Sequence, residues 1–363
     1  MDKERATYAN DEDASHASSA AKQNMIDSQP TQDTQGELEQ LRQQAQEYIQ
    51  AKQWSLASQI LKKLLDHNVH DEDTLRSAVL VFDVMGHYEF VLTLAETLLD
   101  RETNAAYALA YKARALQKLD RLSEATIAND QALLLDTNLP LAWINRSGLQ
   151  LLQQKFPEAL RNAQRAVELA PDDARAWANL GIALLNFNSL LDALEAFNKS
   201  IACDPTNLFS LKLKSETLFK LGRLDEVVTI TRQTLDIDPI NVDALTHATR
   251  ALRSLERYDL LQVTAKELTV LEPKNHFAWE NYMRGLRGSG NFEAANDVLD
   301  HLLELDPSNF RFWTIKADTL YRLQHYREAV SIADRAIFIN QDYPPARRIR
   351  ERALKLMYQR KKV

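Results

Sequence analysis

The sequence predicts an all-α solenoid built from tandem helix-turn-helix units. The first observation is a proline that recurs with a constant 34-residue period, without insertion or deletion, at Pro171, Pro205, Pro239, Pro273 and Pro307. A fixed period of that length is typical of repeats in which each unit is one helix pair stacked on its neighbours. The second observation is composition, because 8 Gly and 10 Pro in 363 residues are too few for the tight turns of a β-sandwich or barrel.

The period sets a register of nine 34-residue units over residues 38–343. The fourth position of each unit is large, the eighth is small in most units, and the twentieth is Ala in six. Positions 4, 7, 8 and 11 form the apolar stripe of an amphipathic helix, and small residues let the two helices of a unit cross closely. Core packing is therefore predicted for the fourth-position tryptophans Trp143, Trp177, Trp279 and Trp313.

The residues that end the helices within each unit follow the same register. Gly86, Gly222 and Gly290 mark the turn between the two helices, because glycine is a helix-stop signal. The recurring proline lies past the second helix, where it prevents that helix from continuing. Both signals predict two helices in each unit.

The unit at residues 174–207 carries the pattern most completely, with Trp177, Leu180, Gly181, Leu184, Ala193, Phe197 and Pro205. This pattern resembles the tetratricopeptide repeat family, and the resemblance covers residues 38–343. It implies a right-handed superhelical solenoid whose first helices line a concave groove for a protein or peptide ligand.

The two ends of the chain differ from the repeats. Residues 1–36 are rich in Asp, Ser, Gln, Thr and Ala and poor in apolar residues, which predicts a disordered acidic N-terminal tail. Residues 344–363 carry eight cationic side chains and one acid after Pro344 and Pro345, which predicts a basic C-terminal capping helix. Its basic face has three interpretations: a solvated surface, a contact with acidic protein such as the chain's own tail, or a contact with nucleic acid or an anionic membrane.

Charge, cysteine content and motifs limit the function classes. The net charge of −7 argues against a dedicated nucleic-acid binder. Cys203 is the single cysteine, which fits a reducing compartment and predicts a cytoplasmic protein. No signal peptide or 18-residue apolar segment is visible. The sequence shows no phosphate-binding loop, nucleophile elbow or zinc-protease motif, so we predict no catalytic residue, metal site or cofactor and no enzymatic activity.

The inward positions of the first helices are the candidate binding surface that the resemblance implies. In the C-terminal half these positions are predominantly cationic, and the candidate residues are Arg250, Arg253, Arg284, Arg287 and Arg311. The sixth position is asparagine three times, at Asn145, Asn179 and Asn281. An amide side chain donates and accepts at once, as a peptide backbone requires, and in several family members an asparagine at this position holds a bound peptide. The alternative is an exposed helix asparagine without a ligand.

These observations predict a non-catalytic adaptor that binds an acidic segment of another protein in the groove. One alternative is a regulatory or targeting subunit of an enzyme complex. Another is a nucleic-acid or anionic-membrane contact through the basic C-terminal helix. Chaperone adaptors of this family clamp a C-terminal carboxylate with five polar residues, and only two of these are roughly kept here, so we do not predict that clamp.

Overall fold

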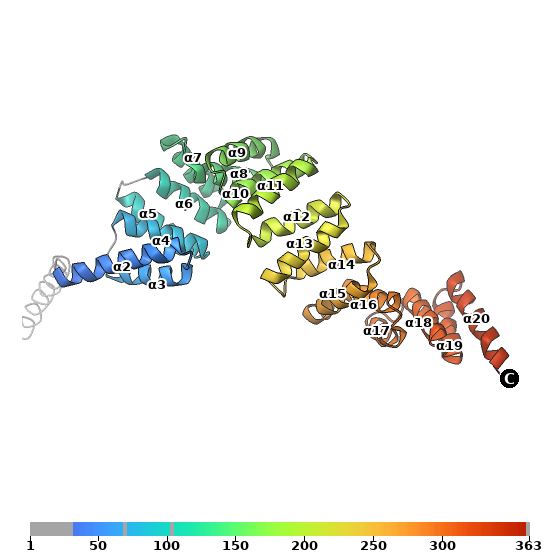
Figure 1. The fold of residues 1–363 in the computed structure, drawn as a ribbon. Helices are drawn as coiled ribbons and strands as arrows, with labels where there is room; N and C mark the ends of the chain where they lie inside the picture. The colour runs from blue at the N-terminus through green and yellow to red at the C-terminus, as the bar shows by residue number, and fades with distance from the viewer. Residues whose placement is uncertain (1–31, 68–70, 102–104, 361–363) are drawn as a thin grey trace, which may run out of the picture. The chain divides into compact units, whose positions relative to one another are not determined.

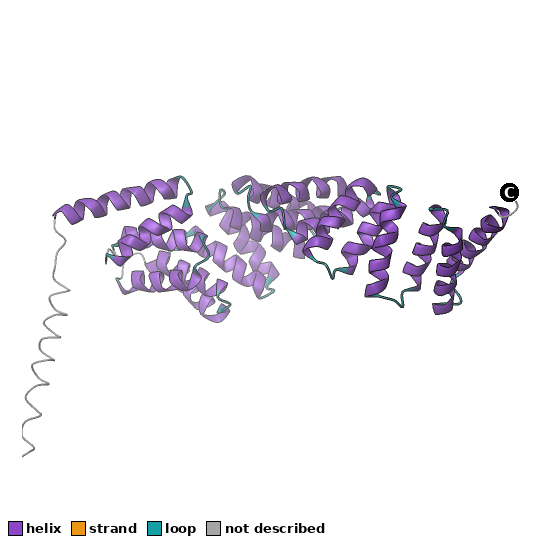
Figure 2. Cartoon of the chain, turned by 90° about the horizontal axis from the view of Figure 1, so that it is seen from below, coloured by secondary structure: helices purple, strands orange, loops and turns teal. Residues whose placement is uncertain are grey.

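The computed structural model describes residues 32–67, 71–101 and 105–360, and all regular structure in these ranges is helical (Figure 2). The helices are α2 (Gln32–Gln50), α3 (Trp54–Asp66), α4 (Glu72–Val84), α5 (Tyr88–Asp100), α6 (Ala105–Lys118), α7 (Leu122–Leu135), α8 (Pro140–Leu152), α9 (Phe156–Leu169), α10 (Ala174–Asn186), α11 (Leu190–Cys203), α12 (Leu208–Lys220), α13 (Leu224–Ile237), α14 (Val242–Ser254), α15 (Tyr258–Leu271), α16 (His276–Gly288), α17 (Phe292–Leu305), α18 (Phe310–Arg322), α19 (Tyr326–Ile339) and α20 (Pro344–Arg360). The predicted all-α repeat fold is confirmed.

The helices follow the 34-residue register closely. The first helix of a unit begins at the expected residue from α8 to α18, and α6 begins one residue early, at Ala105. At the N-terminal end, α2 begins at Gln32, six residues before the expected Leu38. Gln and Glu are good helix formers and no proline follows Pro30 in this stretch, so the helix extends into the end of the segment we predicted to be disordered. Residues 1–31 of that predicted tail lie outside the described residues.

Two compact units divide the chain, at residues 1–145 and 146–363, with the boundary inside α8. Within each unit, helices consecutive in sequence pack against each other in antiparallel pairs (Figure 1). Contacts between first helices of successive repeats, such as α12 with α14 and α14 with α16, are also present. The side chains that bridge these first helices form the surface considered below.

The tryptophans and the recurring prolines interact directly. In four repeats the indole Nε1 donates to the main-chain oxygen six residues earlier, over 2.7–2.9 Å, in the pairs Trp143–Thr137, Trp177–Pro171, Trp279–Pro273 and Trp313–Pro307. This bond ties the loop before a repeat to the first helix of that repeat. It also gives a polar partner to an indole N–H that is otherwise packed against apolar neighbours.

Small residues permit the closest helix crossings. A Cβ on Gly181 would lie 2.5 Å from the Phe197 ring, and one on Gly285 would lie 2.5 Å from the backbone nitrogen of Gln262. Ala at the twentieth position, such as Ala193 and Ala295, is fully buried. Within a repeat the two helices therefore approach at positions that the sequence pattern marks as small, as at Gly181, whereas Gly285 is the tenth residue of its unit and meets α15 of the preceding repeat.

Each repeat turns between its two helices through one residue in the left-handed backbone region. This residue is always the fifteenth of its unit and has φ between 54° and 81°, at Lys52, Gly86, Asp120, Gln154, Asn188, Gly222, Glu256, Gly290 and Gln324. Glycine adopts this conformation without a steric cost, whereas other residues are strained in it. The turn geometry is thus common to all repeats, although glycine marks it in only three.

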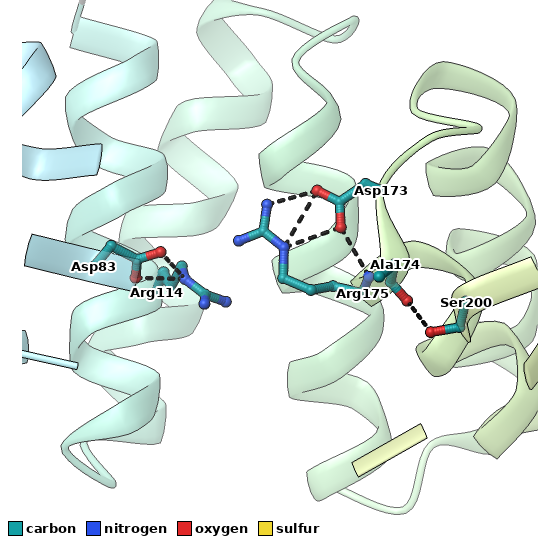
Figure 3. A network of polar contacts seen from close by, with 6 residues as sticks. All are labelled: Asp83, Arg114, Asp173, Ala174, Arg175 and Ser200. Atoms are coloured by element: carbon teal, nitrogen blue, oxygen red, sulfur yellow. Dashed lines mark hydrogen bonds and ion pairs between the residues drawn. The ribbon is translucent and has the colours of Figure 1, made fainter. Parts of the chain in front are cut away.

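Asparagine or aspartate caps most of the first helices. The side chains of Asp71, Asn207, Asn241, Asn275 and Asn309 accept backbone N–H bonds from the first turn of the helix that follows. Asp173 does the same for α10 through the backbone nitrogen of Arg175 (Figure 3). These caps satisfy amides that a helix N-terminus leaves without partners, and they fix where each repeat begins.

The helix α20 continues the register of the repeats. It begins at Pro344, one full repeat period after Phe310, and buries Ala346 and Ala353 completely. Arg350 pairs with Asp334 of α19 at 2.5 Å. Arg348, Arg352 and Lys355 are exposed.

Candidate partner-binding surface

Pairs of side chains with a sequence separation of 31 face each other on the first helices of successive repeats. The clearest pair joins Asp83 of α4 to Arg114 of α6, whose Nε lies 2.5 and 2.7 Å from the two carboxylate oxygens (Figure 3). Asp83 is only 3% exposed. In the unit register this pair connects the twelfth position of one repeat with the ninth of the next. Other side chains share this separation, as in Lys212 with Asp243 at 2.7 Å, which connects the fifth position with the second.

The C-terminal repeats use the same twelfth-to-ninth pair with its charges reversed. Arg287 of α16 donates to Asp318 of α18, and Arg322 donates through Nε to the same carboxylate at 3.0 Å. Burial lowers the pKa of the Arg287 guanidinium, and Arg322 lowers it further. Asp318 acts in the opposite direction. The predicted site residue Arg287 is therefore a half-buried inter-repeat contact as well as a cation at the surface.

Between these two pairs in the sequence lies a position where both partners are cationic. Arg253 of α14 and Arg284 of α16 occupy the twelfth and ninth positions of consecutive repeats, the same register as Asp83 and Arg114. Arg250 and Arg253 each lie over the Phe277 ring with 5.7 Å to its centroid. Within the described ranges neither has an ion pair with a carboxylate, and the exposed Arg284 reaches Glu280 only at 3.7 Å. We call Arg250, Arg253, Phe277 and Arg284 the arginine surface.

Arg311 is exposed on the first turn of α18. Its guanidinium lies 5.9 Å from the ring centroid of the adjacent Phe310, and its backbone nitrogen donates to the capping Asn309. A cation over an aromatic ring at this distance gains a modest attraction and stays available to solvent. Arg311 is thus accessible, but no contact groups it with the arginine surface.

The three asparagines predicted to line the groove are buried or half-buried and bond within the protein. Asn145 is 2% exposed and donates to the Ala110 carbonyl at 2.8 Å, and Asn281 is 1% exposed and donates to the Phe277 carbonyl at 2.7 Å. Asn179, half-buried, donates to Ser147 Oγ at 2.9 Å. Each amide nitrogen therefore bonds within the protein, and the buried Oδ1 atoms of Asn145 and Asn281 have no hydrogen-bond partner among the described residues. We leave them out of the binding surface.

His247 extends the polar surface beside Arg250. Its Nδ1 lies 3.0 Å from Ser215 Oγ on the preceding repeat. Burial is the main reason that the pKa of His247 lies below its ordinary value, and Arg250 lowers it further. A neutral His247 adds no positive charge near pH 7, so the charge of the surface comes from its arginines.

Other candidate chemistry is weak in the described parts of the chain. Cys203 is half-exposed rather than buried, and its Sγ lies 3.7 Å from the Pro171 carbonyl. Burial, with Asp172 and Asp173 nearby, raises the pKa of its thiol, which disfavours the reactive thiolate. The described residues contain no group of three or more metal-ligating side chains. No helix among them is long and apolar enough to cross a membrane.

The architecture of antiparallel helix pairs that recur with one constant period defines a helical-repeat protein. Two segments match family models described as tetratricopeptide repeat, at residues 149–207 and 286–353. The chain therefore contains tetratricopeptide repeats, as the resemblance predicted.

Individual relatives share parts of the chain. Over 96 residues it is 31% identical to the Hsp70-Hsp90 organizing protein of Triticum aestivum, a match that covers 26% of this chain and 16% of that relative. The solved structure of pilF from Pseudomonas aeruginosa is 20% identical, covers 57% of this chain and 95% of its own, and has a TM-score of 0.50. The structure of YrrB, described as a TPR protein with an unusual peptide-binding site, is 18% identical over 50% of this chain and 94% of its own, with a TM-score of 0.46. At these identities the structural likeness concerns the fold alone.

Proposed function

We propose that this protein is an adaptor that binds an acidic segment of a partner protein on the arginine surface. The observation that carries the proposal is the like-charged pair of Arg253 and Arg284. Asp83–Arg114 and Arg287–Asp318 show that the chain can complement charge at the equivalent positions. Two cations at the same positions leave positive charge without a partner between the repeats, and a carboxylate from outside would compensate it.

The geometry of the surface suits an extended acidic chain. Guanidinium groups bind carboxylates through two parallel N–H donors, and Arg250 and Arg253 already share one aromatic platform in Phe277. Asp243 and Glu280 lie at the edges, where Lys212 and Arg284 engage them. The uncompensated charge therefore lies mainly on Arg250 and Arg253 of α14, beside Phe277.

The relatives support only the general role. The wheat relative is named as an organizing protein of Hsp70 and Hsp90, and we carry over from that name the holding of other proteins, not those partners. The cytoplasmic location and the absence of catalysis are parts of the same proposal.

Charge reversal tests the proposal. Arg250→Glu with Arg253→Glu changes the net charge by four units and places repulsive groups where the partner would bind. Arg232→Glu with Lys266→Glu changes it equally on exposed positions of the second helices α13 and α15. In affinity purification with quantitative mass spectrometry, we expect the first variant to lose acidic partners by about tenfold or more and the second to retain them. Equal retention by both variants would refute the binding surface.

A further inference from the structure

A pocket of about 320 Å³ lies beside the arginine surface, between the helices α15, α16, α17 and α18. Tyr258 and Phe292, the first residues of α15 and α17, supply aromatic walls. Met283 and Ile315 supply apolar lining from the first helices. The pocket is therefore located where the turns inside two successive repeats meet.

One glycine makes the aromatic wall possible. A Cβ on Gly288 would overlap Cγ of Tyr258, far inside contact distance, so only glycine admits the ring at this position. Gly288 itself also lines the pocket. The wall is held by close helix packing rather than by a mobile loop.

Three guanidinium groups converge on this pocket. They belong to Arg284, Arg287 and Arg322, and two carboxylates are close to them. Asp318 is shared by Arg287 and Arg322, and Glu280 lies 3.7 Å from Arg284. Each guanidinium has five N–H donors, so two carboxylates leave many of them without an acceptor.

Arg287 shows this deficit most clearly. Its Nε is buried and has no hydrogen-bond partner among the described residues. The neighbouring Arg322 and Arg284 also disfavour its charge, although burial is the larger effect. Buried polar groups of native proteins almost always have partners, so a guanidinium that lines a pocket and still lacks one acceptor is suited to an anionic ligand.

We propose that the pocket binds a phosphoryl group carried on an apolar stem, as on a phosphorylated side chain of the partner. A phosphoryl group offers three accepting oxygens to the three guanidinium groups, whereas a carboxylate offers two. Tyr258, Phe292 and Met283 would pack against the stem. The inference rests on the proposed function in that the phosphorylated segment belongs to a bound protein, but the pocket uses residues outside Arg250 and Arg253.

Phenyl phosphate is the probe that tests this pocket on the purified full-length chain. Calorimetric titration should give saturable binding of phenyl phosphate, and weaker binding of both benzoate, which keeps the ring, and inorganic phosphate, which lacks it. Benzoate binding as tightly would overturn the phosphoryl assignment, and inorganic phosphate binding as tightly would overturn the apolar stem. No saturable binding of phenyl phosphate would overturn the proposal as a whole.

Matched variants locate the binding. Arg322→Gln alters a side chain that is 53% exposed, so we expect folding to be retained and binding to weaken by about tenfold. Arg327→Gln, on the exposed surface of α19, is the control and should bind as the wild type does. Arg250→Glu with Arg253→Glu should also keep phenyl phosphate binding while losing the acidic partner, which separates failure of the pocket from failure of the adaptor proposal. Unchanged affinity in Arg322→Gln would contradict the site.

Discussion

Asp83 and Arg114 form a short ion pair with little access to water, so their contribution to the free energy of unfolding can be measured by single substitutions. The Asp83 carboxylate is 3% exposed, and Arg114 Nε approaches both of its oxygens. Removing two charges from water is expensive, so the net contribution of such a pair can be small while the loss of one partner remains costly.

Removing one side chain of this ion pair should therefore lower the free energy of unfolding more than removing both. We expect Arg114→Ala to lower the free energy of unfolding by about 3–5 kcal/mol, because it leaves a buried carboxylate without compensation. Arg114→Ala combined with Asp83→Ala should cost less than Arg114→Ala alone. Urea unfolding of the two single variants and the double variant measures the coupling. A double variant at least as unstable as the sum of the single variants would contradict this account of the pair.

The burial of the asparagines could not be predicted from the sequence. Asn145 and Asn281 lie at positions that a helical wheel turns toward the groove, yet they are buried and bonded inside the stack. Their burial depends on how closely the neighbouring helix approaches, and periodicity within one helix contains no information on that distance. Arg250, at another inward position of the same register, is exposed. The exposure of Arg250 was predictable for this reason, and the burial of the asparagines was not.

At the scale of the helices, the turn inside each repeat was only partly visible in the sequence. Glycine marks it in three repeats, and the structure places a left-handed residue at the same position in the other described repeats, including Glu256 with φ of 54°. The tryptophan bonds were hidden for a similar reason, because the indole partner is a main-chain oxygen whose position depends on the loop. The recurring proline and the tryptophan, treated separately in the sequence, belong to one contact.

Backbone conformation predicts opposite effects at two of these turns. Gly222 has φ of 71° and open space around its missing side chain, so Gly222→Ala should cost about 1 kcal/mol from conformation alone. Glu256→Gly should gain a similar amount, because glycine accepts the left-handed region without strain. Thermal and urea unfolding of both variants measures these changes. Two changes of the same sign would show that side-chain contacts, rather than φ, control the stability of the turn.

At the scale of the whole molecule, contacts connect each repeat chiefly with its neighbours. A stack of this kind is stabilised by repeat and nearest-neighbour terms, so its surface can change from one repeat to the next without a change of fold. The repeat period therefore predicted where most first helices begin, whereas the candidate binding surface required the pairing of the twelfth position with the ninth position of the next repeat. That pairing became visible through Asp83–Arg114, and in the same register Arg253 and Arg284 are two cations.

The central claim, that the arginine surface holds an acidic partner, is tested most directly by site-specific photo-crosslinking in the native cell. p-Benzoylphenylalanine replaces Phe277 in one variant and the exposed Phe338 of α19 in a second, so that each reports on its own surroundings. We predict that the probe at 277 captures a partner through an acidic segment and that the probe at 338 does not. Capture of the same partner from 338 alone, or of no partner from 277 by a folded chain, would contradict the claim.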